Sequence, residues 1–333
     1  MQNFLDPAIL FFVFGVFAGA VRSNLEIPPA IAKFLSLYLL MALGLKGGFA
    51  LAESGLSHTI LVSLGAALLM AFLVPVLGYQ FLKNRVSRFD AAAIAASYGS
   101  VSAVTFVTAM QYLETHDMAP GGHMAVALVI MESPAILMAV LLANMLRQQQ
   151  ARDGALAVPG NTIDGQVPAR LSKRKILHES FTDGAQLLLL GGMAVGFLSG
   201  DAGKAVMAPF SIDLFKGMLA FFLLDMGLMV AKSFSEVRGR SFALIAYASV
   251  APVIHAGIAL GLSPLLGLPV GDAALLMVLS ASASYIVVPA VLRFAIPEAN
   301  PSIYLGLSLG VTFPLNILFG IPLYAYAAKR FLA

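Results

Sequence analysis

Apolar runs long enough to cross a lipid bilayer recur along almost the whole chain. Hydrophobic residues make up 59% of the 333 residues and charged residues only 11%, less than half of the roughly 25% typical of a soluble domain. No soluble core buries so much apolar surface, so the bilayer must be the solvent. We therefore predict an all-α integral membrane protein with ten transmembrane helices, near residues 6–22, 29–53, 58–83, 90–116, 121–147, 180–199, 209–234, 239–263, 271–296 and 300–328.

A polar stretch at residues 148–179 divides the chain into two five-helix units, 1–147 and 180–333. Its five basic residues stand among Gly, Pro, Gln and Asp, which predicts a mobile linker that could also dock a partner. If ten spans cross the membrane, fifteen of the 20 Lys and Arg residues fall on the side of this linker. Cytoplasmic connections carry the excess of positive charge. We therefore expect a cytoplasmic linker and both termini outside.

The two halves resemble each other at a nearly constant offset along the chain, which indicates an internal duplication. The matching segments are Gly15–Gly19 with Gly192–Gly196, Leu43–Leu45 with Met226–Leu228, Asp90–Ala92 with Asp272–Ala274, Ser100–Ser102 with Ser280–Ser282, and Pro134 with Pro314. An odd number of spans per unit turns the second copy upside down. Two inverted five-helix repeats with the substrate held between them are a recurring design of secondary transporters.

The fourth and ninth spans carry small hydroxyl residues at alternate positions inside apolar runs. Such a pattern suits an opened helix, in which ligand, water or side chains satisfy the free backbone groups. Two half-helix N-termini meeting near the membrane centre would bind an anion without a buried Arg or Lys. The alternative is an unbroken helix whose serines bond to the preceding turn. The candidate substrate-binding residues are Gly99, Ser100, Ser102, Ser280, Ser282 and Ser284.

Few ionisable residues fall inside the spans. Glu132 is a functional candidate, because a carboxylate at membrane depth is costly; the alternative is a protonated or paired structural residue. Lys46 and Asp225 occupy similar places in equivalent spans and could pair, and His255 is more typical of a packed core histidine than of a proton relay. The five histidines show no metal-ligand spacing, cysteine is absent, and we find no nucleotide-binding loop. Nothing therefore supports an ATP-driven pump.

Three segments resemble the sodium-dependent bicarbonate transporter family of the cyanobacterial SbtA type. They are Gly99 to Thr105, Glu132-Ser133-Pro134-Ala135 with Ala143-Asn144, and Ser280 to Arg293 followed by Ile296-Pro297-Glu298-Ala299-Asn300-Pro301-Ser302. The resemblance extends over most of the chain outside the linker. It implies ten spans in inverted repeats, a homotrimer, and substrate and Na⁺ at the broken fourth and ninth helices. It also implies a cytoplasmic face open to a PII-like regulatory protein.

Carried over from the family, Ser102 and Thr105 match hydroxyls of the fourth-span motif, and Ser282 and Ser284 match serines of the ninth. Candidate cation ligands are Thr105, Glu132, Thr312 and Asn316. The sequence departs from the cyanobacterial pattern at six positions. In the ninth span, Tyr285 replaces the family's Asp, Val288 replaces Gly, Ala290 replaces Pro and Val291 replaces Thr. In the fourth span, Ala103 replaces Gly and Val104 replaces Ser.

The leading hypothesis is a non-enzymatic secondary transporter in the inner (plasma) membrane that imports a small anion. Bicarbonate with sodium symport is the best guess, and Na⁺ is the only co-substrate expected. Proton coupling through Glu132 and another anion, such as sulfate or a small carboxylate, are alternatives. A membrane sensor or scaffold that reports to a PII-like partner is a hypothesis from a second class. An intramembrane enzyme is disfavoured, because no nucleophile–base pair or metal signature is present.

Overall fold

The computed structural model describes residues 6–54, 58–157, 184–237 and 241–332, and these are helical with no strand among them. The first half contains α1 (Pro7–Ala20), α2 (Pro29–Ser54), α3 (His58–Leu82), α4 (Arg88–Gly99), α5 (Ala103–Thr115) and α6 (Met124–Ala157). The second half contains α8 (Gly184–Ala208), η2 (Pro209–Asp213), α9 (Phe215–Val237), α10 (Phe242–Leu266), α11 (Val270–Ala281), α12 (Val287–Ala295), α13 (Pro301–Leu305), η3 (Gly306–Thr312), α14 (Phe313–Leu315), η4 (Asn316–Gly320) and α15 (Ile321–Leu332).

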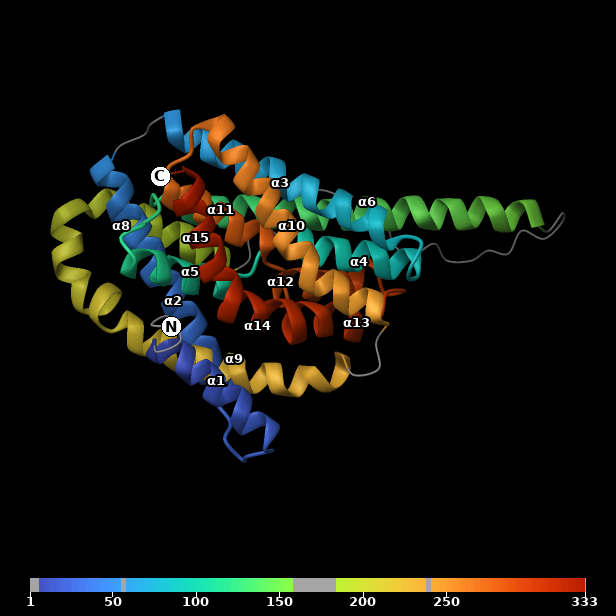
Figure 1. The fold of residues 1–333 in the computed structure, drawn as a ribbon, viewed down its shortest axis with the longest axis horizontal. Coiled ribbons are helices and arrows are strands. Elements are labelled where there is room, and N and C mark those ends of the chain that lie inside the picture. Colours follow the sequence, from blue (N-terminus) through green and yellow to red (C-terminus); the bar gives the residue numbers. More distant parts are fainter. Residues whose placement is uncertain (1–5, 55–57, 158–183, 238–240, 333) are drawn as a thin grey trace.

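Six helical segments of the described chain are long and apolar enough to cross a membrane, which makes this a multi-pass arrangement. They are Pro29–Glu53, His58–Leu82, Arg88–Thr115, Leu187–Ser233, Phe242–Leu266 and Pro301–Leu332. The 47 residues of Leu187–Ser233 would extend about 70 Å as one straight helix, over twice the ~30 Å hydrocarbon thickness. The chain instead bends at Gly200 (φ 52°, ψ −143°) and curves back through η2 into α9 (Figure 1). The ten-span arrangement stays a prediction.

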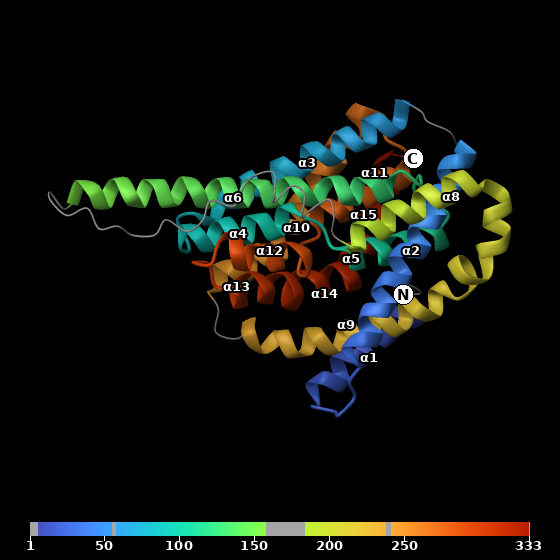
Figure 2. The same cartoon turned by 180° about the vertical axis from the view of Figure 1, so that it is seen from behind.

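The helices form two groups that we name by their composition. The four-helix bundle consists of α1, α2, α8 and α9, in which α2 packs along α8 and α1 along α9. The crossing bundle consists of α3–α6 and α10–α15. The two groups lie side by side in both views (Figures 1 and 2), and the main contact between them joins α9 to η3.

Glycines allow the two helix pairs of the four-helix bundle to approach closely. A Cβ at Gly227 of α9 would lie 2.2 Å from the Phe12 carbonyl oxygen of α1. A Cβ at Gly44 of α2 would lie 2.3 Å from the Leu189 carbonyl oxygen of α8. These contacts require glycine, because no real Cβ approaches a backbone oxygen so closely. The sequence repeat that aligns Gly15 with Gly192 also aligns Phe12 with Leu189, so the two contacts correspond to each other in the two halves.

The helix α6 extends beyond the predicted start of the linker. The linker was expected to begin at residue 148, whereas α6 continues to Ala157. Gln148 to Arg152 contain no helix breaker and are good helix formers. The described part of this helix reaches Ala157. The rest of the predicted linker lies outside the described residues.

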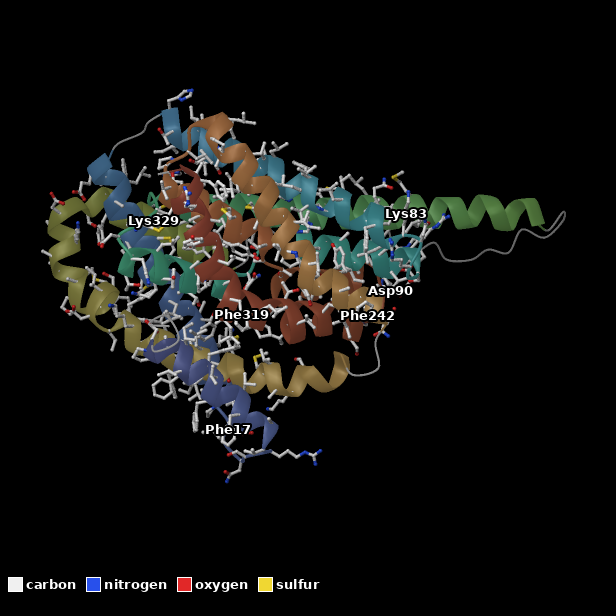
Figure 3. All side chains as sticks on the ribbon, in the orientation of Figure 1. Phe17, Lys83, Asp90, Phe242, Phe319 and Lys329 are labelled. Carbon is white, nitrogen blue, oxygen red and sulfur yellow. The ribbon has the colours of Figure 1, made fainter. Side chains whose placement is uncertain are left out.

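The ends of the molecule differ in character. Lys83 and Asp90 lie at the end toward which α6 extends, whereas Lys329 and both chain ends lie away from it (Figures 1 and 3). Large apolar side chains are exposed on many of the long helices, including Phe17 (60% exposed) on α1 and Leu61 (71% exposed) on α3. An exposed apolar band of this kind fits contact with lipid.

Candidate functional site

Two helices of the crossing bundle are interrupted where the hydroxyl-rich sequences predicted. The first break separates α4, which ends at Gly99, from α5, which begins at Ala103. Ser102 starts the second half-helix as its N-cap, because its Oγ accepts a hydrogen bond from the Thr105 amide at 3.2 Å. Gly99 lies against α3, where an added Cβ would come within 2.6 Å of the Pro75 ring. The second break separates α11, which ends at Ala281, from α12, which begins at Val287.

Hydrogen bonds join the two breaks directly. The Ser102 amide donates to Ser282 Oγ at 3.1 Å, and Ser282 Oγ donates in turn to the Leu279 carbonyl at 2.8 Å. The Ser284 amide donates to the Ser97 carbonyl at 2.7 Å. The structure therefore brings together serines of the fourth and ninth spans, which are distant in sequence and belong to different halves. We call residues 97–105 and 280–288 the crossing.

Three hydroxyls at the crossing have no hydrogen-bond partner among the residues that the structure describes. They are the side chains of Ser97, Ser100 and Ser280, and all three are buried. An unsatisfied buried polar atom costs roughly 1–3 kcal/mol, and such groups commonly point to a ligand, ion or water. Ser100 and Ser280 were predicted. Ser97 was missed, although its place three residues before Ser100 puts it on the same face of α4.

Partial charges of both signs converge at the crossing. The first amides of α5, those of Ala103 and Val104, have no partner within the helix and carry the positive end of its dipole. The carbonyl ends of α4 and α11 carry the negative ends. Residues 97–105 and 280–288 contain no charged side chain. The crossing therefore offers donors to an anion and oxygens to a cation without a fixed ionic group.

The four candidate cation ligands occupy different places. Thr312 accepts a hydrogen bond from the Tyr98 hydroxyl at 2.6 Å and donates to the Ala248 carbonyl at 2.7 Å. Asn316 donates to the Ala281 carbonyl at the end of α11, at 2.7 Å. Thr105 is buried in the first turn of α5, and Glu132 is buried in α6, where it has an interaction partner. Hydrogen bonds thus tie Thr312 to α4 and Asn316 to α11.

The predicted pairing of Lys46 with Asp225 is wrong. Lys46 Nζ instead contacts both carboxylate oxygens of Glu114, at 2.8 and 3.1 Å, and lies 4.7 Å from the centre of the Phe215 ring. The last turn of α5 lies beside α2 at this level, and sequence similarity between spans does not reveal that contact. The Lys46–Glu114 ion pair joins the four-helix bundle to the crossing bundle. His255 is buried in α10, and its Nδ1 has no hydrogen-bond partner among the described residues.

Tyr285 lies at the boundary between the bundles. Its ring meets Phe313 edge to face with centroids 5.2 Å apart, and Phe313 meets Phe12 of α1 in the same way at 5.7 Å. Its hydroxyl contacts Met226 Sδ of α9 at 3.8 Å. The phenol therefore extends from the crossing to the four-helix bundle.

The comparison with known families decides which class of protein has this crossing. The model of the Na⁺-dependent bicarbonate transporter superfamily matches residues 7–329. The chain belongs to this superfamily. The match covers nearly the whole chain and confirms the resemblance found in the sequence. Among curated proteins, no sequence matches this chain significantly.

Membership in the superfamily places the chain among multi-pass membrane transporters whose coupling ion is Na⁺. It favours transport over catalysis and a small anion as the substrate. No cluster of three or more His, Cys, Asp or Glu side chains within the described ranges is arranged to hold a metal ion. Hydroxyl and carbonyl oxygens, which suit a hard cation, are plentiful at the crossing.

Proposed function

We propose that the protein imports bicarbonate together with Na⁺ through a site at the crossing. The observation that carries the proposal is the group of buried hydroxyls of Ser97, Ser100 and Ser280, which have no partner among the described residues. The first amides of α5 at the same crossing have no partner within their helix. Bicarbonate presents acceptor oxygens to amides and hydroxyls, and its own hydroxyl donates to a carbonyl. Superfamily membership supports both the anion and the coupling ion.

The same residues provide complementary places for the two ions. The anion is held by Ser100, Ser102, Ser280, Ser282 and Ser284, and Gly99 supports this site by letting the end of α4 pack against Pro75 of α3. The cation is held by oxygens of the negative ends of α4 and α11, with Thr105, Thr312, Asn316 and Glu132 as its candidate ligands. Mutual attraction between the neighbouring ions makes each bind more tightly in the presence of the other.

Two inverted five-helix repeats account for the paired contacts on both sides of the crossing. Asp90 in the first turn of α4 accepts a hydrogen bond from the Asn300 amide at 2.7 Å. Asp272 in the first turn of α11 accepts one from the Gly121 amide at 2.7 Å. The sequence repeat aligns the two aspartates, and nearly the same offset separates the two donors, so each repeat bonds the other in the same manner. This correspondence supports inverted duplication.

Alternating access follows from movement of one bundle against the other. Close glycine contacts hold α1 to α9 and α2 to α8 within the four-helix bundle, and the Lys46–Glu114 ion pair links this bundle to the crossing bundle. Rocking at this boundary would expose the crossing first to one side of the membrane and then to the other. Tyr285 lies on that boundary and would shield the site.

The cellular setting follows from charge and family. We place the protein in the inner (plasma) membrane with both termini outside, because the basic end at Lys83 fits the cytoplasmic side. A homotrimer and a PII-like cytoplasmic regulator are proposed from the family resemblance. Proton coupling at the buried Glu132 is the alternative to Na⁺, and sulfate or a small carboxylate is the alternative to bicarbonate.

Ligand-dependent thermal stability of the purified protein tests this site. Bicarbonate is expected to raise the melting temperature more in Na⁺ than in K⁺ buffer, and Na⁺ to raise it more with bicarbonate than with chloride. Sulfate and formate serve as competing anions. A shift by sulfate or formate that exceeds the shift by bicarbonate, or identical shifts in Na⁺ and K⁺, would exclude the proposed pair. A sensor would show the same binding but no concentrative uptake.

A further inference from the structure

A pocket lies at the basic end of the molecule between α3, α4 and α6, at the opposite end of α4 from the crossing. It has a volume of about 400 Å³, which is within the usual range for small-ligand sites. Its lining includes Tyr79, Lys83, Asn84, Arg88, Leu142 and Met145. Lys83 marks its position in Figure 3, next to the start of α4.

One half of this lining presents hydrogen-bond donors and positive charge. Lys83 follows α3 and donates to Gln80 Oε1 at 2.5 Å, which leaves other ammonium hydrogens for a ligand. Arg88 is the first residue of α4, so the positive end of that helix dipole adds to its charge. Arg88 has an interaction partner in the structure, and the five N–H donors of a guanidinium can serve a partner and a ligand together.

The other half of the lining is apolar and continues into the perimeter of the molecule. Met145 is 58% exposed, and Leu141 of the same helix is 45% exposed. Leu142 and Leu146 of α6 complete the apolar side of the lining. Tyr79 lines the pocket where the apolar band meets the basic end, a place that tyrosine favours in membrane proteins.

We propose that this pocket binds the headgroup of an anionic phospholipid. The phosphate lies between Lys83 and Arg88, the headgroup hydroxyls face Asn84, and the acyl chains run along Leu142 and Met145. A soluble phosphate or an acidic protein segment would use only the charged half, whereas the lining is half apolar and opens onto the lipid-facing band. Basic pockets between transmembrane helices bind anionic headgroups in this way. The inference goes beyond the proposed transport activity and does not depend on it.

Native mass spectrometry of the full-length protein with phosphatidylglycerol or phosphatidylcholine tests the proposal. The test variant is Lys83→Gln/Arg88→Gln. The matched control is Arg85→Gln, which removes a third cation from the same connection. Arg85 donates to the Phe81 carbonyl and lies 3.8 Å from the centre of the Phe81 ring, outside the pocket lining.

The wild-type protein and Arg85→Gln are expected to retain phosphatidylglycerol in preference to phosphatidylcholine. Each basic residue contributes about fivefold at an anionic surface, so the double variant is expected to bind phosphatidylglycerol roughly 25-fold more weakly. Equal retention by the double variant would overturn the proposal, as would equal binding of both lipids by the wild type. Displacement of the lipid by millimolar glycerol phosphate would assign the pocket to a soluble phosphate instead. Cross-linking of a second copy through Tyr79 would assign it to a subunit interface.

Discussion

Removal of the two unpartnered hydroxyls of Ser100 and Ser280 separates a binding role from a structural one. Both side chains are buried and neither makes a hydrogen bond within the described chain. Ser100 has extended backbone (φ −97°, ψ 179°) that alanine adopts freely, and Ser280 lies in the last turn of α11, where alanine is the better helix former. The Ser100→Ala/Ser280→Ala variant is therefore expected to be as stable as the wild type or more stable.

The effect on substrate binding has the opposite sign. A hydrogen bond to a charged ligand contributes about 1.5–3 kcal/mol, which corresponds to roughly a 10- to 150-fold change in affinity per hydroxyl. The KM for bicarbonate should therefore rise at least tenfold in the double variant, whereas its melting temperature should not fall.

Transport kinetics in proteoliposomes and thermal unfolding of the same preparations check this prediction. Ser263→Ala is the matched control, because this buried serine donates to the Ala259 carbonyl at 2.8 Å in α10. The control should leave KM unchanged. An unchanged KM in the double variant would refute the assignment of these hydroxyls to the substrate. A large loss of stability would show that they have structural partners.

Three further predictions concern the crossing, the helix packing and one ion pair. Ser282→Ala leaves the Ser102 amide without its acceptor and should lower the free energy of unfolding by roughly 1–3 kcal/mol; equal chemical denaturation of variant and wild type would contradict this. Gly227→Ala pushes a Cβ into a backbone carbonyl of α1 and should lower the free energy of unfolding by about 1–3 kcal/mol. Gly217→Ala, with open space around the added Cβ, should stabilise α9 slightly. Equal denaturation midpoints for the two variants would exclude the tight contact at Gly227. Arg147 donates hydrogen bonds to the Glu298 carboxylate and thereby lowers its pKa. This carboxylate therefore stabilises the fold above its unfolded pKa of about 4.3, and the stabilisation is lost as the pH falls through its lower folded pKa. The melting temperature of Glu298→Gln should accordingly be below that of the wild type at neutral pH and converge with it in acid, and a difference that is constant with pH would rule out the linkage.

The positions of both helix breaks could be predicted from sequence, because hydroxyls at alternate positions inside an apolar run are a local signal. Ser102 and Ser282 were identified in this way. Their mutual hydrogen bond could not be predicted, since it depends on how two distant segments cross. The same limit explains Ser97, whose backbone carbonyl accepts from Ser284 across the crossing.

Other features were missed. The wide turns of η3 and η4 in the last long helix were not anticipated, although Pro314, which removes a helical hydrogen bond, lies between them. Such wide turns often occur at functional sites, and η3 forms the main contact of the crossing bundle with the four-helix bundle, through α9. The partner of Lys46 was mispredicted because the repeat aligns spans with each other but does not specify which spans are neighbours.

The family match and the crossing together make a specific claim about transport. Uptake of radiolabelled bicarbonate into proteoliposomes, at fixed pH and with or without an inward Na⁺ gradient, tests that claim most directly. The account predicts concentrative uptake that requires the Na⁺ gradient and weakens in the Ser100→Ala/Ser280→Ala variant. Uptake that is equal without Na⁺, or no bicarbonate uptake while sulfate or a small carboxylate accumulates, would contradict it.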